Sequence, residues 1–130
     1  MLVKGKQLTT IWLENDEVKI IDQRFLPYEL KIVILKNLQE TIYAIKEMQV
    51  RGAPLIGVTA AFGMYLSSKK KSKLDYLIDC GNKLKKSRPT AVNLSWAVDY
   101  MIKEIKNIEE KNRPNYLLKL ANEIRQKDID

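Results

Sequence analysis

The segment from Pro54 to Leu66 most constrains how this chain can fold. It is apolar on nearly every side of a helix and contains no charged residue. A helix of that kind is normally buried in the centre of a core, because none of its faces suits water. Glycines interrupt the segment, and it is too short to span a bilayer. We therefore expect a central core helix, with Pro54 in its first turn.

The stretches on either side predict the elements that cover this helix. Before it, three short apolar runs are typical of strands, and Asn15–Asp16 is expected to form the turn between the first two. From Asn37 onward, on both sides of the central segment, apolar residues recur at helical spacing. The predicted strands lie at 11–13, 18–21 and 31–35, and the predicted helices at 37–51, 54–66, 74–86, 94–108 and 117–124. The sequence thus predicts an α+β fold: a small antiparallel three-stranded β-sheet followed by a bundle of about five α-helices, in one domain.

Several residues mark the expected helix ends and the expected core. Asn37 and Glu40 are predicted to cap the first of these helices, and Gly52 is predicted to end it in a left-handed conformation. Thr90 is available to cap the helix that follows Pro89. Further side chains expected to face inward are Trp12, Ile78, Trp96 and Ile108.

Composition excludes several kinds of site. The chain has no histidine, which rules out Ser-His-Asp or Cys-His catalytic groups and histidine-ligated metals within it. The single cysteine, Cys80, has no partner for an internal disulfide and is expected to pack in an amphipathic helix rather than act as a nucleophile. Asp22, which closes a strand, is expected to be a turn or hydrogen-bonding residue rather than a catalytic carboxylate.

The net charge of +7 arises largely from lysines at 69–73 and from the basic residues at 83–88. Such a surface attracts nucleic acid, membranes or anionic metabolites. Because no nucleic-acid-binding module accompanies the lysines, we expect a solvated basic surface instead, with no membrane or nucleic-acid partner. The first residues lack the apolar region of a signal peptide, so a cytoplasmic location is expected.

One turn combines an arginine with the start of the central helix. Arg51, Gly52 and Ala53 precede it, and the first amides of a helix lack internal partners and carry partial positive charge. Small residues let a ligand approach the main chain, and a guanidinium can bind phosphate through two hydrogen bonds. In the alternative interpretation, Arg51 only complements the carbonyls that end the preceding helix. The sequence leaves both interpretations open.

A second turn, at residues 87–94, repeats this arrangement. Here Arg88 precedes Pro89 and another helix start. Taken alone, Arg88 is more typical of a solvated surface residue. If the two helix starts lie side by side, Arg51 and Arg88 are expected to bind the same anion.

Both turns resemble the motifs of a known family. Residues 51–58 with Ala60 and Ala61 are similar to the RGAPxIGVxAA signature of methylthioribose-1-phosphate isomerases, and residues 87–94 match their SRPTAVNL motif. Residues 21–27 resemble the family's early IDQ-xx-LP segment. Related families are the regulatory subunits of translation initiation factor 2B and ribose-1,5-bisphosphate isomerase.

The resemblance implies an aldose–ketose isomerase, an intramolecular oxidoreductase, that converts 5-methylthioribose 1-phosphate to 5-methylthioribulose 1-phosphate in methionine salvage. It implies that Arg51, Gly52, Ala53 and Arg88 bind the sugar-phosphate substrate, without a metal or an organic cofactor, and that the full-length protein is a homodimer. It also implies that residues 1–130 are the N-terminal domain. The catalytic cysteine and aspartate would then lie in an absent C-terminal Rossmann-like domain, so no catalytic residue is expected in this chain. The fragment alone is expected to be inactive.

Other functions remain open at this point. The chain is alternatively a regulatory or interaction module related to translation initiation factor 2B subunits, or a truncated, inactive relic. Nucleic-acid binding through the lysine clusters ranks last.

Overall fold

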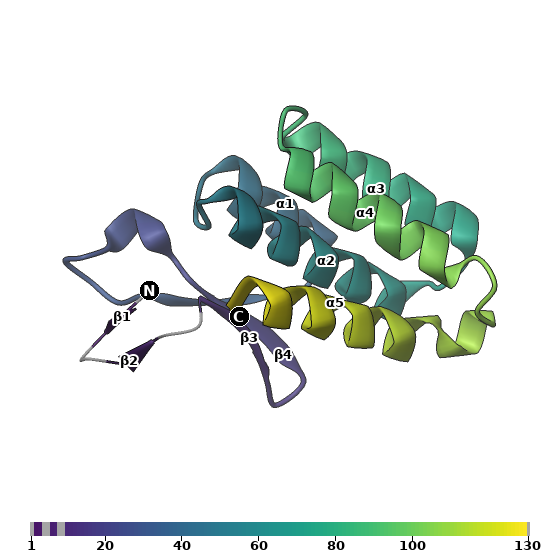
Figure 1. Ribbon diagram of the computed structural model, residues 1–130, viewed down its shortest axis with the longest axis horizontal. Helices are drawn as coiled ribbons and strands as arrows, with labels where there is room; N and C mark the ends of the chain where they lie inside the picture. Colours follow the sequence, from purple (N-terminus) through teal and green to yellow (C-terminus); the bar gives the residue numbers. More distant parts are fainter. Residues whose placement is uncertain (1, 4–5, 8–9, 130) are drawn as a thin grey trace.

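The structure, a computed structural model, describes residues 2–3, 6–7 and 10–129. In that part of the chain, a three-stranded antiparallel sheet lies beside a layer of five α-helices (Figure 1). Buried residues of the sheet and of the helices form one continuous hydrophobic core. The predicted α+β class, and the predicted order of a sheet followed by helices, are confirmed.

The sheet is built from β3 (Ile11–Glu14), β4 (Glu17–Ile21) and β5 (Ile32–Leu35), in that spatial order. Asn15 and Asp16 join β3 to β4 with φ values of 53° and 65°. A two-residue hairpin turn with positive φ at both positions matches the twist of its strands, and Asn and Asp tolerate that conformation better than most residues. The predicted hairpin is therefore confirmed. A second antiparallel pair, β1 (Leu2–Val3) with β2 (Lys6–Gln7), was not predicted.

Helices make up the remainder of the described fold. A short 3-10 helix, η1 (Gln23–Phe25), follows β4, and another, η2 (Glu110–Asn112), precedes the last α-helix. The α-helices are α1 (Leu38–Lys46), α2 (Ala53–Lys70), α3 (Leu74–Ser87), α4 (Val92–Ile105) and α5 (Arg113–Ile129). None of the described helices is both long and apolar enough to cross a membrane.

Helix α2 is the centre of the molecule, as its all-round apolar surface predicts. Every residue from 55 to 68 is buried, and α2 packs against the other four α-helices (Figure 1). Two of its buried hydroxyls are satisfied within the helix: Thr59 Oγ1 donates to the Leu55 carbonyl at 2.7 Å, and Ser67 Oγ donates to the Gly63 carbonyl at 2.8 Å. Satisfied polar groups of this kind remove the penalty for burying them.

Three predicted helix ends were wrong. Helix α1 stops at Lys46, well before Gly52, because the chain turns at Met48, whose φ is 61°. Gly52, with φ of 95°, instead forms the N-cap of α2. Thr90 does not cap α4, since Ala91 holds that position without a side-chain hydrogen bond. Helix α4 ends at Ile105, so Ile108 does not continue its inward stripe.

Two predicted core side chains are on the surface. Trp96 is 52% exposed and Ile78 is 37% exposed. The buried stripe of α4 runs through Leu94, Val98 and Met101, and Trp96 projects away from it. Its ring stacks on Tyr100, with centroids 5.0 Å apart, so α4 carries a stacked aromatic pair beside its buried stripe. Trp12 is half-buried.

Candidate anion site at two helix starts

Helices α2 and α4 begin beside each other. A Cβ atom placed on Gly57, in the second turn of α2, would lie 3.1 Å from the carbonyl oxygen of Asn93 and 3.3 Å from its carbonyl carbon. Asn93 belongs to the first turn of α4. The loops that lead into α2 and α4 therefore lie at one end of the helical layer, where α5 also ends (Figure 1). These loops carry Arg51 and Arg88, respectively.

The side chains of Arg51 and Arg88 make no hydrogen bond or ion pair with any described residue, whereas the other three arginines are all engaged. Arg51 is exposed and Arg88 is half-buried. Arg24 donates two hydrogen bonds to the Asp22 carboxylate. Arg113 donates to the carbonyls of Ile105 and Ser72, and Arg125 donates to the carbonyl of Ile11. The guanidiniums that are free to take a ligand are thus the two that belong to the motif turns.

The helix starts beside these arginines have no side-chain cap. Gly52 and Ala91 are the N-cap residues of α2 and α4, and neither contributes a side-chain hydrogen bond. Helix α1 differs, because Asn37 Oδ1 accepts from the Glu40 amide at 2.9 Å. First-turn amides that keep their hydrogen-bonding capacity and partial positive charge are suited to an anion.

Gly52 is required for its backbone conformation rather than for space. Its φ is 95°, a value that L side chains rarely adopt, yet a Cβ atom there would meet nothing within 4 Å. The main chain at Gly52 is consequently open to approach from solvent. Ala53 and Pro54, which follow it in the first turn of α2, are also exposed.

A cavity of about 380 Å³ opens between the starts of α2 and α4 and the end of α5. Its lining is mainly apolar, with one cation, and neither Arg51 nor Arg88 is part of it. The lining residues are Pro54, Gly57, Val58, Asn93, Trp96, Ala97, Ile124 and Lys127. Lys127 is the titratable side chain of this lining, which includes no carboxylate or thiol, so the cavity offers mainly apolar contacts beside the two helix starts.

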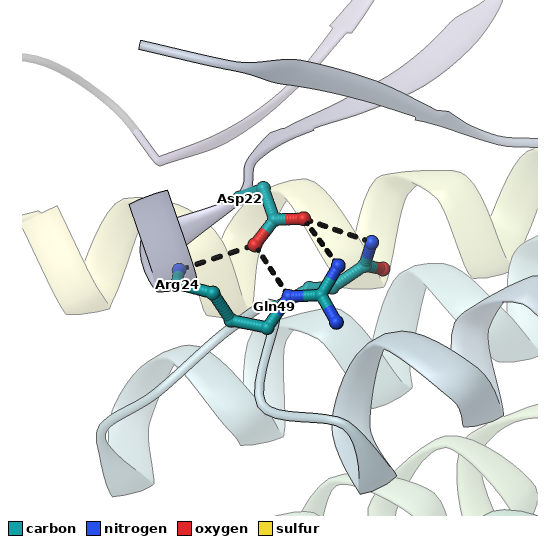
Figure 2. Close-up of polar contacts among 3 residues, drawn as sticks. All are labelled: Asp22, Arg24 and Gln49. Atoms are coloured by element: carbon teal, nitrogen blue, oxygen red, sulfur yellow. Dashed lines mark hydrogen bonds and ion pairs between the residues drawn. The ribbon is translucent and has the colours of Figure 1, made fainter. Parts of the chain in front are cut away.

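Asp22 lies in a separate polar cluster with Arg24 and Gln49, shown in Figure 2; Asp22 and Gln49 are buried, and Arg24 reaches solvent. Burial is the largest single influence on its pKa and raises it. The hydrogen bonds from Arg24 and Gln49 together outweigh burial and hold the pKa of Asp22 below the ordinary carboxyl value. The carboxylate is fully engaged, so the expectation that Asp22 is a hydrogen-bonding residue is confirmed.

Sequence reasoning missed Gln49, Trp96 and Lys127. Gln49 is a buried polar residue beside an arginine motif, but nothing in the sequence indicates its burial. Trp96 and Lys127 join the cavity because α4 and α5 meet there. Cys80 is 1% exposed in α3, as expected of a packing residue.

Residues 49–129, which include both motif turns, match the model of the Initiation factor 2 subunit family. The chain belongs to this family. Helices α2 to α5, and with them both helix starts of the candidate site, thus fall within the part that the family shares.

Within this family, the chain is similar to proteins named methylthioribose-1-phosphate isomerase. It is 42% identical over 132 residues to the protein of Rhizobium meliloti (strain 1021), and 40% identical over 131 residues to that of Escherichia coli O45:K1. These alignments cover 100% and 99% of the chain, but only 36% and 35% of the relatives. The chain spans about a third of the length of these relatives, and the resemblance to the isomerases is confirmed.

Two solved structures share its fold. The 5-methylthioribose 1-phosphate isomerase of Pyrococcus horikoshii OT3 matches with a TM-score of 0.83 and 35% identity, over 92% of this chain and 36% of that one. Subunit delta of translation initiation factor eIF-2B from A. fulgidus matches with a TM-score of 0.82 and 28% identity, over 95% of this chain and 38% of that one. The same fold therefore occurs in an isomerase and in a translation factor.

Proposed function

We propose that this chain is the N-terminal, substrate-binding domain of an aldose–ketose isomerase that converts 5-methylthioribose 1-phosphate to 5-methylthioribulose 1-phosphate. The observation that carries the proposal is the pair of neighbouring, uncapped helix starts, each preceded by an arginine with no side-chain partner among the described residues. The similarity of the whole chain to named isomerases supports this substrate over other anions.

In this proposal, the chain binds and positions the substrate. The guanidiniums of Arg51 and Arg88 and the main chain at Gly52 and Ala53 hold the phosphate and nearby oxygens. Fixing one end of the sugar orders the reacting carbons before chemistry begins, which lowers the entropic part of the barrier. The reaction requires ring opening and transfer of a proton or a hydride between adjacent carbons. The cysteine and aspartate that promote it belong to a C-terminal Rossmann-like domain outside this chain.

The proposal has consequences for the complete protein. The complete protein then acts in methionine salvage, in the cytoplasm, as a homodimer, and without a metal or an organic cofactor. Residues 1–130 alone bind the substrate weakly and do not turn it over.

A fusion protein tests the proposal directly. Residues 1–130 are joined to the remaining part of the Rhizobium meliloti relative, and conversion of 5-methylthioribose 1-phosphate is measured for the fusion and for the fragment alone. We expect turnover only in the fusion. Arg51→Ala should abolish turnover. Arg51→Lys keeps the charge but loses the pair of hydrogen bonds that a guanidinium makes to phosphate, so it should retain a small part of the turnover.

Lys111→Ala is the matched control for these variants. Lys111 is 80% exposed, and its Nζ lies 3.7 Å from Glu109 Oε2, so losing it should leave turnover unchanged. Normal turnover in the Arg51→Ala fusion would remove the proposed site. An active fusion would also contradict the interpretation of the chain as an inactive relic.

The match to subunit delta of eIF-2B supports one alternative, a regulatory or interaction module. That function predicts an inactive fusion and stable binding to a translation-factor subunit in a purified system. Nucleic-acid binding has less support, because Lys83 and Lys85 are paired with Asp79 and Asp99. Affinity for RNA or DNA that collapses with added salt would favour it.

A further inference from the structure

Asp22 is a buried carboxylate whose two oxygens are both occupied (Figure 2). Its Oδ1 accepts from the Arg24 amide at 3.1 Å and from Arg24 Nε at 3.0 Å. Its Oδ2 accepts from Arg24 Nη2 at 2.8 Å and from Gln49 Nε2 at 3.1 Å. Only 1% of the Asp22 side chain is exposed. A buried charge persists only when it is paired and hydrogen-bonded in this way.

The bond to Gln49 joins segments that lie 27 residues apart in the sequence. The main chain reinforces it, because the Gln23 amide donates to the Gln49 carbonyl at 2.8 Å. The Asp22 amide in turn donates to the Lys31 carbonyl at 2.8 Å. Residues 22 and 23 therefore hold both the side chain and the main chain of Gln49, two positions before Arg51.

The segment held in this way is the loop that joins α1 to the start of α2. After Met48, the Gln49 amide donates to the Ala44 carbonyl at 2.9 Å, and Val50 is completely buried. Arg51 and Gly52 then emerge into solvent. The anchored part of the connection thus ends immediately before the residues that face a ligand.

We propose that Asp22 is a positioning residue for the candidate anion site: through Gln49, its carboxylate fixes the turn that presents Arg51 and Gly52. This inference rests on the proposed function of that turn. A turn that is already ordered loses less conformational freedom on binding, so anchoring it raises affinity without any contact between Asp22 and the ligand. Loosening the anchor should weaken phosphate binding by roughly tenfold.

Inorganic phosphate is the probe, titrated into the ¹⁵N-labelled chain while NMR follows the amide signals of Gly52 and Ala53 and the Nε signal of Arg51. Wild type should bind with a dissociation constant on the order of millimolar, as expected for one small anion. Asp22→Asn keeps the shape but places an amide opposite the donors of Arg24 and Gln49. It should weaken binding roughly tenfold and speed hydrogen exchange at Gln49 and Val50, whose amides donate to the Ala44 carbonyl. Amide signals away from the turn and from residues 22–24 should stay unchanged.

Asp16→Asn is the matched control, since it makes the same chemical change in the β3–β4 hairpin. Asp16 Oδ2 lies 3.4 Å from Lys69 Nζ, at the end of α2 opposite to Gly52, so phosphate affinity should not change. If Asp22→Asn does not fold, Gln49→Met cuts only the link to the turn and leaves the pair between Asp22 and Arg24 intact. It should weaken phosphate binding in the same direction.

The outcomes separate the two proposals. Phosphate binding that Arg51→Ala weakens but neither Asp22→Asn nor Gln49→Met affects overturns the positioning role and leaves the anion site in place. The absence of any phosphate-induced shift in wild type overturns the anion site itself, and the positioning role with it. Weakened binding measured well below the melting temperature of the variant, where it is fully folded, supports positioning, because a purely structural role would lower the stability and leave the phosphate affinity of the folded chain unchanged.

Discussion

Adding one methyl group at Gly57 tests the geometry on which the candidate site depends. In Gly57→Ala, the new Cβ would lie 3.1 Å from the carbonyl oxygen of Asn93 and 3.3 Å from its carbonyl carbon. Carbon contacts are most favourable at roughly 3.5–4.0 Å, so the atoms must separate by a few tenths of an ångström. The obstacle is the main chain of a helix and cannot rotate aside. Helix α4 must therefore move away from α2.

The expected effect on stability follows from two opposing terms. Overpacking of a well-packed contact costs about 1–3 kcal/mol. Replacing glycine by alanine inside a helix stabilises the fold by about 1 kcal/mol, because alanine restricts the unfolded chain more. The net expectation for Gly57→Ala is a loss of about 1 kcal/mol in the free energy of unfolding, which corresponds to a melting temperature lower by about 4 °C. Phosphate binding at the shared helix starts should weaken as well.

Urea unfolding followed by circular dichroism at helical wavelengths measures the stability, and Gly63→Ala in the same helix is the control. Its new Cβ would lie 2.8 Å from Thr41 Cγ2, which is a side-chain methyl group. Thr41→Ser removes that methyl while its hydroxyl can still donate to the Asn37 carbonyl, a bond of 2.9 Å in the wild type. Gly63→Ala should destabilise, Thr41→Ser should restore most of that loss in the double variant, and phosphate binding should not change in either.

A Gly57→Ala chain that is more stable than wild type, as helix propensity alone predicts, would refute this reasoning. It would mean that α2 and α4 are not in contact at Asn93. Unchanged phosphate binding in a destabilised Gly57→Ala chain would instead confirm the contact and separate it from the anion site.

Three further predictions concern other parts of the fold. Because the folded-state pKa of Asp22 is below the ordinary value, its stabilising effect is complete above about pH 4 and is lost as the pH falls through the folded-state pKa. The difference in unfolding free energy between wild type and Asp22→Asn should therefore shrink on acidification, and a constant difference would contradict this. Met48→Gly should raise stability by about 0.5 kcal/mol, since a side chain at φ of 61° is strained; a lower melting temperature would show that the contacts of Met48 matter more. Asn37→Ala should lower the free energy of unfolding by about 1 kcal/mol, because it removes the cap on the Glu40 amide, whereas Asn37→Asp should lower it little. Equal losses for the two variants in urea unfolding would argue against the cap.

Features that depend on neighbouring residues could be predicted from the sequence. The all-round apolar surface of α2 required a central position, and Asn37 with Glu40 located the start of α1. Asn15 and Asp16 located a hairpin, because both tolerate positive φ. Each of these follows from a few adjacent side chains and the local preferences of the backbone. The order of sheet and helices followed from the same local patterns.

Features that depend on which faces meet in space could not be predicted. Trp96 is a large apolar residue of the kind expected in a core, but the packing of α2, α4 and α5 leaves it half-exposed at the mouth of a cavity. The bond between Asp22 and Gln49 spans 27 residues, and no local pattern indicates it. Motif resemblance located Arg51 and Arg88 separately. That α2 and α4 start at one end of the bundle follows from close packing at Gly57, where the absence of a side chain lets two helices touch. Contacts of this kind depend on how the surfaces of segments far apart in the sequence fit together, so only the folded structure shows them.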